Sequence, residues 1–392
     1  MKMTQPSPWK CKSGLVLLFF CVWTTFLPAE RITRTLVGEV TVGSETKITS
    51  QGPRPVRVDG RGAIDVRNEG NAYVVSGWRP LPHLFVLDQR AEFRSWDQTR
   101  VRQEVYLTLE TDTPAQADSL LGALRIGLVV SPTNRLRLDY DLNIATVNVH
   151  NQWFTQKANY LVLDDGRRFP IRYFALRTVV YLPAGNPLEL ELDHCALVLE
   201  DRTGPTRITQ RHGSLRGGCF NSLEAELRGV VADVDSLTTG DLTLEDTALR
   251  LGASSTLHLR AALAKIDLGS VTNLTVTRSL NDEIRINSLA RAELTEVLFG
   301  SFVCGRLTEE LTLTARNTDV RVNELSATIK RVRMDNRTAD IHLGVGRLSV
   351  YRLARDPSGK NTYHLPSSPP IKAAGPLLRL LGTHCRYRLT IP

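Results

Sequence analysis

The chain has 392 residues, of which 42% are hydrophobic and 23% charged, and its formal net charge is +8. This composition is typical of a folded protein and excludes wholesale disorder, and the length predicts two domains or one elongated repeat body. The Lys and Arg residues are scattered through alternating segments, so we expect a solvated basic surface and no nucleic-acid partner.

Residues 1–29 have the pattern of a secretory signal peptide. Three lysines lead into an apolar run from Gly14 to Leu27, and Pro28-Ala29 offers a small residue for cleavage near Ala29. The run is shorter than the roughly 20 residues that span a bilayer, so an uncleaved anchor is the alternative. We therefore expect an extracytoplasmic protein (periplasmic, on the outer-membrane surface or secreted), with no transmembrane segment in the mature chain.

Residues 30–183 predict an N-terminal β region of short strands separated by Gly-rich turns. Residues 91–97 predict one strand, which ends at an Asp97-Gln98 turn. Asp164-Asp165-Gly166 predicts a hairpin turn. The next strand after the first turn should bury one face, which holds Val101, Gln103, Val105, Leu107 and Leu109.

One short helix is expected near 113–124. Thr113 is a suitable N-cap, Pro114 suits the first turn, and a single apolar stripe follows before Gly127. We expect this helix to cap the strands.

From Leu188 onward, short alternating segments recur about every 18 residues. Inside most units a second apolar pair follows, and such a unit is too short to bury its own apolar face. Stacked units can bury it, which predicts a β-solenoid (a β-helix) over 184–350. The units begin at Leu188, Thr206, Leu223, Leu242, Leu257, Leu274, Ala292, Leu311 and Thr328.

Residues 351–392 predict a linker followed by a capping strand at 386–391, which would cover the open end of the solenoid. The mature chain holds four cysteines, Cys195, Cys219, Cys304 and Cys385. The first three lie in or beside apolar strand segments and are expected to be buried thiols, with one or two disulfides as the alternative.

No catalytic, cofactor-binding or metal-ligating residue is predicted, since the chain contains no HExxH, CxxC, GxSxG, Walker or GxGxxG motif. His258 and His342 each lie between inward-facing residues and should point outward. Arg216-Gly217-Gly218 could approach a phosphate, although a Gly pair in a turn is the simpler interpretation. The acids along the repeats differ in their offset within the unit, which argues against a carboxylate cluster; they include Asp233, Asp235, Asp241, Glu245, Asp246, Asp267 and Asp282.

The order of parts resembles the "putative adhesin" β-solenoid family of Gram-negative envelope proteins, especially those of the Bacteroidota. The resemblance spans roughly 84–350 and implies an adhesin-like role without catalytic residues. It depends on Phe93-Arg94-Ser95-Trp96-Asp97, on Ala115-Gln116-Ala117-Asp118-Ser119-Leu120-Leu121, on Val179-Val180-Tyr181-Leu182-Pro183, on Asn186-Pro187-Leu188-Glu189-Leu190, and on the units from 206 onward.

Together these patterns predict an all-β, non-enzymatic protein that needs no cofactor. Its function would be to present outward Thr, Arg and Glu side chains to an envelope or extracellular protein or glycan. A carbohydrate-active β-helix enzyme and a structural envelope spacer are the alternatives. A deep acidic cleft lined by three or more aligned carboxylates would favour the enzyme.

Overall fold

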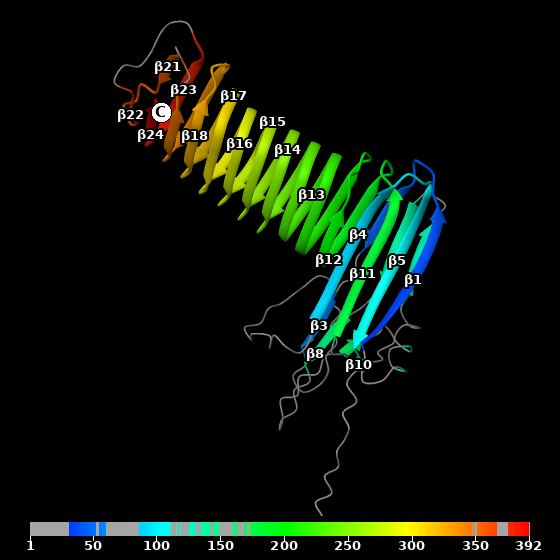
Figure 1. Ribbon diagram of the computed structural model, residues 1–392. Coiled ribbons are helices and arrows are strands. Elements are labelled where there is room, and N and C mark those ends of the chain that lie inside the picture. Colours follow the sequence, from blue (N-terminus) through cyan, green and yellow to red (C-terminus); the bar gives the residue numbers. More distant parts are fainter. Residues whose placement is uncertain are drawn as a thin grey trace, which may run out of the picture.

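A computed structural model describes residues 31–51, 55–59, 86–110, 115, 118, 125–130, 135–141, 144–148, 160–162, 168–170, 173–346, 348, 351–366 and 375–391 (Figure 1). The expected signal peptide lies outside these residues. The described chain is almost entirely β, which confirms the predicted class. The capping helix is not seen: of 113–124 only Ala115 and Asp118 are described, both helical, and the rest lies outside the described residues. No helix in the described part is long and apolar enough to cross a membrane.

Four long strands form a flat sheet at the N-terminal end of the molecule, which we call the N-terminal sheet. They are β1 (Arg31–Thr41), β4 (Val86–Trp96), β5 (Arg100–Glu110) and β11 (Tyr173–Pro183). β11 lies between β4, to which it is parallel, and β5, to which it is antiparallel, while β1 pairs with the far edge of β5. Strand β5 buries every second residue on the predicted face, and the expected turn separates β4 from β5.

Shorter strands surround this sheet: β2 (Lys47–Gln51), β3 (Pro55–Asp59), β6 (Arg125–Val130), β7 (Arg135–Asp141), β8 (Ile144–Asn148), β9 (Tyr160–Val162) and β10 (Arg168–Pro170). β9 and β10 pair antiparallel, as expected of strands that flank a hairpin, although the predicted turn itself lies outside the described residues. β2 pairs in parallel with β7 on one side and with the first strand of the following region on the other.

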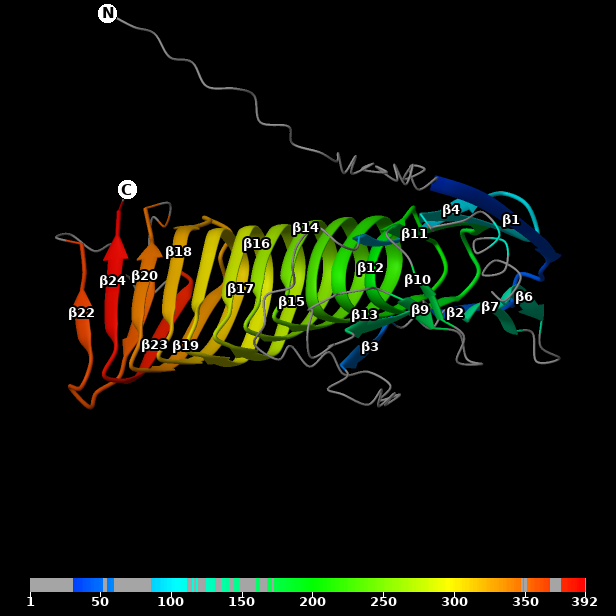
Figure 2. The same ribbon diagram turned by 90° about the horizontal axis from the view of Figure 1, so that it is seen from below.

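The following region, which we call the strand stack, belongs to the same long, open sheet as the N-terminal sheet. Each strand pairs in parallel with the next, and most paired Cα atoms belong to residues 17 or 18 positions apart, such as Leu188 with Thr206 and Glu283 with Ser301. This offset matches the period of the sequence, and Figure 2 shows the strands side by side in a row. The strands are β12 (Leu188–Leu199), β13 (Thr206–Glu245), β14 (Ala248–Ala262), β15 (Lys265–Leu280), β16 (Glu283–Leu298), β17 (Ser301–Arg316), β18 (Asp319–Leu325), β19 (Arg331–Arg337) and β20 (Asp340–Gly344).

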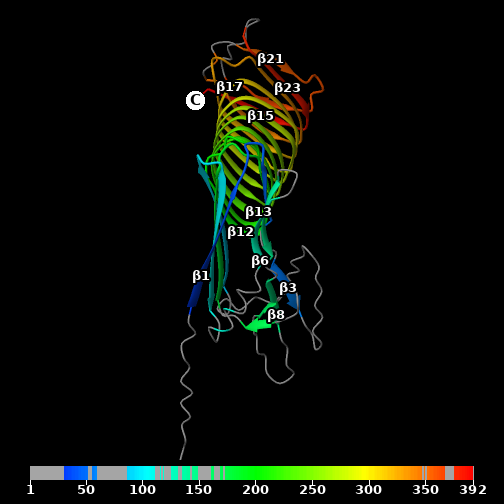
Figure 3. The same ribbon diagram turned by 90° about the vertical axis from the view of Figure 1, so that its right-hand side faces the viewer.

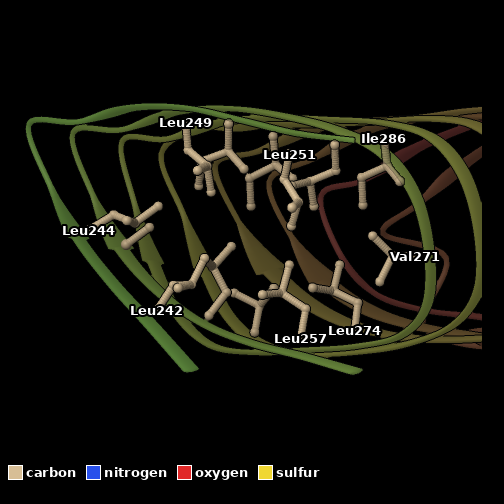
Figure 4. Close-up of a cluster of buried hydrophobic side chains, with 14 of the residues drawn as sticks. Leu242, Leu244, Leu249, Leu251, Leu257, Val271, Leu274 and Ile286 are labelled. Carbon is tan, nitrogen blue, oxygen red and sulfur yellow. The ribbon is translucent and has the colours of Figure 1, made fainter. Parts of the chain in front are cut away.

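The interior of the strand stack is made of aliphatic side chains that lie in register. Leu249 pairs with Ile266, Ile266 with Ile284, and Ile284 with Phe302, and all four are buried. Figure 4 shows such side chains pointing from facing segments toward a common interior. Burying each one stabilises the fold by roughly 1.5–3 kcal/mol before the entropy of ordering is subtracted, so neighbouring turns of the chain stabilise one another.

In successive turns of the stack, one corner is made by a residue whose backbone lies in the left-handed region. Nine of the described corner residues are not glycine, and their φ angles lie between 49° and 57°. Gly229 (φ 61°) takes the same position between His212 and Asp246. Their N–H groups continue the ladder: Asp246 donates to Ala262 O and Leu263 to Leu280 O. Figure 3, seen nearly along the stack, shows successive turns overlapping in outline. The corner residues are His194, His212, Asp246, Leu263, Asn281, Phe299, Asn317, Thr338 and His384.

The C-terminal strands are not stacked in chain order. They are β21 (Arg352–Arg355), β22 (Thr362–His364), β23 (Leu377–Thr383) and β24 (Arg386–Thr390). β23 lies between β19 and β21, and β24 lies between β20 and β22. Strand β24, the segment expected to cap the end of the stack, therefore lies between two other strands. Its alternate apolar residues are buried, which requires a neighbouring strand on both sides. The half-exposed β21 and β22 form the end instead (Figure 2).

All four described cysteines are free thiols. Cys195, Cys304 and Cys385 are buried, and burial raises the pKa of the Cys304 thiol to about 12. Cys219 is exposed, so the prediction of a buried thiol is wrong there. The reason is strand alternation: its neighbour Phe220 points inward and is 2% exposed, which turns Cys219 toward solvent.

Candidate functional site

The histidines singled out by the sequence do not gather into a site. His258 is exposed, and His342 lies within 2.9 Å of the Thr390 hydroxyl. His194 and His212 pack at adjacent corners with ring centroids 4.5 Å apart and ring planes inclined by 42°. Within the part of the chain that the structure describes, no three His, Cys, Asp or Glu side chains are placed to hold a metal ion.

The acids of the repeats do not form one carboxylate cluster. Asp233 and Asp267 alternate with Arg250 and Arg285 in a single row of paired positions. Asp282 is buried, and its carboxylate accepts bonds from the Ala264 N–H (2.7 Å), the Ser279 hydroxyl (2.7 Å) and the Leu280 N–H (2.8 Å). Burial raises the pKa of Asp282. Because all three hydrogen bonds join its carboxylate to residues of the same corner, we assign Asp282 a structural role there.

A groove of about 400 Å³ lies where the N-terminal sheet meets the strand stack. Three carboxylates line it, which is the feature that the enzyme alternative calls for. Two of them are already engaged, however: Glu200 accepts the Ser95 N–H (3.0 Å) and Asp201 accepts the Cys219 N–H (2.7 Å). The groove is lined by Ser95, Val198, Leu199, Glu200, Asp201, Arg216, Gly217, Gly218 and Asp235.

The Arg216-Gly217-Gly218 segment forms one wall of this groove. A Cβ on Gly218 would lie 2.3 Å from Asp201 Oδ1, so a larger residue there would displace this carboxylate from its present position. Three carboxylates around the same space would repel a phosphate. The glycine pair lies within strand β13 and not in a turn, so the simpler interpretation of the sequence is wrong about its place, and we assign the pair to packing.

Arg202 fills the position in the interior next to this groove. It pairs with Phe220 in a β-bridge and is 2% exposed. Its guanidinium donates to Pro183 O (2.8 Å) and to Asn186 O, which ties the turn after β11 to the first turn of the stack. Burial lowers the pKa of Arg202 to about 10. We assign it a structural role, as the residue that closes this end of the interior.

The densest polar constellation lies on the outward face of the N-terminal sheet and was not anticipated from the sequence. Its centre is Glu92, whose side chain is 4% exposed. Arg177 (2.8 Å) and Arg94 (3.0 Å) donate hydrogen bonds to its carboxylate, and Arg90 forms an ion pair with it at 3.0 Å. Desolvation alone would raise the pKa of Glu92, but the bonds from Arg177 and Arg94 outweigh it, so the pKa lies below its ordinary value.

Aromatic rings flank this charged centre. The Arg177 guanidinium lies 5.6 Å from the centroid of Tyr106, and that of Arg94 lies 5.9 Å from the centroid of Tyr181. Trp96 packs against Tyr181 with centroids 5.5 Å apart. Flat rings beside half-exposed guanidinium groups can stack on a ligand and donate hydrogen bonds to it. The alternation Arg90-x-Glu92-x-Arg94-x-Trp96 was a signal for this face, since residues two apart share one side of a strand.

Two rows of outward side chains run along the strand stack. The first row follows paired positions of one side, namely Asp241, His258, Thr275, Glu293, Thr312, Arg333 and Arg379. The second row follows another side, namely Asp233, Arg250, Asp267, Arg285, Val303, Arg321, His342, Arg388 and His364. All these residues are exposed or half-buried. Arginine is the commonest residue in the two rows, as expected, but Asp and His outnumber the predicted Thr and Glu.

Comparison with known proteins gives distant structural likenesses only. No family model matches the chain, and no curated protein matches it. Among solved structures, a "putative adhesin" from Bacteroides fragilis shares 10% identity at a TM-score of 0.25, covering 91% of this chain and 97% of the other. A "putative adhesin" from Parabacteroides distasonis shares 10% identity at a TM-score of 0.24 with the same coverage. A "putative cell adhesion protein" from Clostridium sporogenes shares 7% identity at 0.16, covering 91% and 99%.

Proposed function

We propose that the chain is an extracytoplasmic, non-catalytic interaction module of adhesin-like type, built on a β-solenoid whose outward rows contact a protein or glycan of the envelope or the extracellular space. The observation that carries this proposal is the in-register parallel pairing of the strand stack. This pairing repeats outward side chains at intervals of about 4.8 Å over a long exposed surface. An extended surface of this kind suits an extended ligand or a broad protein face.

The test is a binding screen of the full chain against glycan and extracellular-protein arrays, followed by two matched variants. One replaces His258, Thr275 and Glu293 of the first row by alanine, and the other replaces Arg250, Asp267 and Arg285 of the second row. Both sets are exposed or half-buried, so each variant should fold, which circular dichroism checks. We expect a ligand whose binding one variant loses and the other keeps. A screen without any ligand would favour a structural spacer and contradict the proposal.

A carbohydrate-active enzyme is the second candidate, because three carboxylates line one groove. Glycoside hydrolysis needs two carboxyl groups that act as a pair. Glu200 and Asp201 are held by backbone N–H groups, and only Asp235 has no such bond among the described residues. Release of reducing ends from a polysaccharide panel, abolished by Asp235→Asn, would establish the enzyme and overturn the non-catalytic proposal.

A further inference from the structure

Acidic and basic side chains are unevenly divided along the strand stack. Residues 188–329 contain 14 Lys or Arg against 21 Asp or Glu, a net charge of −7. Residues 330–392 contain 12 Lys or Arg against 3 Asp or Glu, a net charge of +9. Strands β19, β21, β23 and β24 carry most of these basic residues, and Figure 1 shows the C-terminal strands together at one end of the molecule. We call this end, built from β18 to β24, the basic end.

The first row shows the change of charge at Arg333 and Arg379, before Ala354 on β21 ends it. Arg333 on β19 and Arg379 on β23 are paired and exposed, so two guanidinium groups leave neighbouring strands side by side. Like charges at paired positions destabilise a sheet. Arg331, also outward on β19, is neutralised by Glu310 at 3.1 Å, but neither Arg333 nor Arg379 has a carboxylate partner among the described residues.

The second row shows the same change of charge, and its early and late parts can be compared directly. In its early part, Asp233, Arg250, Asp267 and Arg285 alternate in sign, so neighbours attract. In its last part, Arg321, His342, Arg388 and His364 follow one another on four adjacent strands without an acid in the row. Asp340, 3.6 Å from Arg388, is the carboxylate that approaches this stretch.

The surroundings of these arginines decide between classes of anionic ligand. Tyr351 and Tyr387 are fully buried, and Tyr363 is stacked on Tyr387 with Arg355 over its ring, so these rings cannot receive nucleic-acid bases. Ile391 is the one large hydrophobic side chain exposed at the described part of this end, which is too little to anchor it in a bilayer. Guanidinium groups bind carboxylate and sulfate oxygens in a bidentate manner.

We propose that the basic end of the strand stack binds an acidic polysaccharide, whose carboxylate or sulfate groups lie along the arginines near the ends of the two rows. A chain of regularly spaced anions satisfies both rows at once, and it relieves the repulsion between Arg333 and Arg379. This proposal rests on the proposed function, because it names the ligand class for one end of the interaction surface.

The experiment measures binding of the full chain to immobilised polygalacturonate and heparin, with dextran as the neutral polymer. Two variants, Arg333→Gln with Arg379→Gln and Arg321→Gln with Arg388→Gln, remove the charges near the ends of the two rows. The matched control, Arg250→Gln with Arg285→Gln, removes two charges from the alternating part of the second row. We expect each basic-end variant to weaken binding about tenfold or more, with the control unchanged, and binding to fall as salt rises.

Equal losses in the control and the basic-end variants would overturn the proposal, as would tighter binding to anionic lipid vesicles or to single-stranded DNA than to either polysaccharide. Unchanged binding by both basic-end variants would overturn it as well. If the acidic polymers do not bind but the array screen yields another ligand, this inference fails and the proposed function stands. If neither yields a ligand, both fail. Thermal unfolding of each variant separates lost binding from lost folding.

Discussion

The strand stack and the N-terminal sheet are made of similar strands but hold together in different ways. In the stack, buried aliphatic residues repeat at paired positions, and the ion pairs join exposed side chains such as Arg228 and Glu245, which are 60% and 52% exposed. Exposed pairs of this kind contribute little stability. The stability of the stack is therefore hydrophobic and distributed along its length.

In the N-terminal sheet, by contrast, one buried carboxylate organises the outward face. Glu92 is 4% exposed and forms ion pairs with three arginines on two strands. Removing the carboxylate from such a cluster leaves like-charged guanidinium groups close together without an opposite charge between them. A repeat therefore spreads its stability over many equivalent contacts, whereas the outward face of this sheet is organised around one charged residue, so its stability should respond to pH.

The largest expected effect breaks the aliphatic interior of the stack. Phe302 on β17 is fully buried and lies between Ile284 and Val320. Phe302→Ala should cost about 3–5 kcal/mol in the free energy of unfolding, because the cavity left in a packed interior adds to the lost burial. Urea denaturation followed by circular dichroism measures it. The exposed Arg285→Ala is the control and should change stability by less than about 0.5 kcal/mol. Similar values for the two variants would contradict a shared interior.

The second effect tests the charged centre of the N-terminal sheet. Glu92→Gln keeps the shape but removes the charge, and it should cost about 1–3 kcal/mol at pH 7. Because the pKa of Glu92 is lowered in the folded state, its stabilising contribution is full above the unfolded pKa of about 4.3 and disappears as pH falls through the lower folded value.

Denaturation of both proteins between pH 7 and pH 2.5 measures this difference. The wild type and Glu92→Gln should converge in stability at the acid end. Glu245→Gln, which removes an exposed partner of Arg228, is the control and should cost less than about 1 kcal/mol at any pH. A gap between wild type and Glu92→Gln that persists unchanged at pH 2.5 would show that the arginine cluster does not depend on the carboxylate charge.

The two regions also differ in how much of them the sequence could predict. The repeat offset and the buried faces followed from the spacing of aliphatic residues, because alternation and period are local properties of a strand. The arginine cluster around Glu92 could not be placed, because Arg177 reaches Glu92 from a strand 85 positions away in the chain. The insertion of β23 and β24 between earlier strands is likewise a matter of long-range pairing.

The candidate site was predicted less well than the fold. Outward Thr, Arg and Glu were expected, but the division of charge along the stack was overlooked, although separate charge counts for 188–329 and 330–392 would have shown it. A recurring signal was also overlooked. His194, His212, Asp246, Asn281 and Asn317 recur at the period of the repeat, and Asn, Asp and His are the non-glycine residues that best tolerate a left-handed backbone.

The smallest expected effect concerns that corner, which sharpens the comparison because every positive-φ residue among the described residues lies in the stack or its C-terminal end. Leu263 (φ 57°) and Asn281 (φ 56°) occupy the same corner position in consecutive turns, and Leu263 is 60% exposed. A left-handed backbone costs a branched apolar residue about 1 kcal/mol, which asparagine largely avoids by local hydrogen bonding. Leu263→Asn should therefore raise the free energy of unfolding by about 0.5–1 kcal/mol, since little burial is lost. The reciprocal Asn281→Leu is the matched control and should lower it by a similar amount. Equal and opposite shifts in the urea midpoint would show that the stack imposes the corner conformation on any residue at this position. Two shifts of the same sign would mean instead that the side chains at this corner make contacts of their own, and that the turns of the stack are not equivalent.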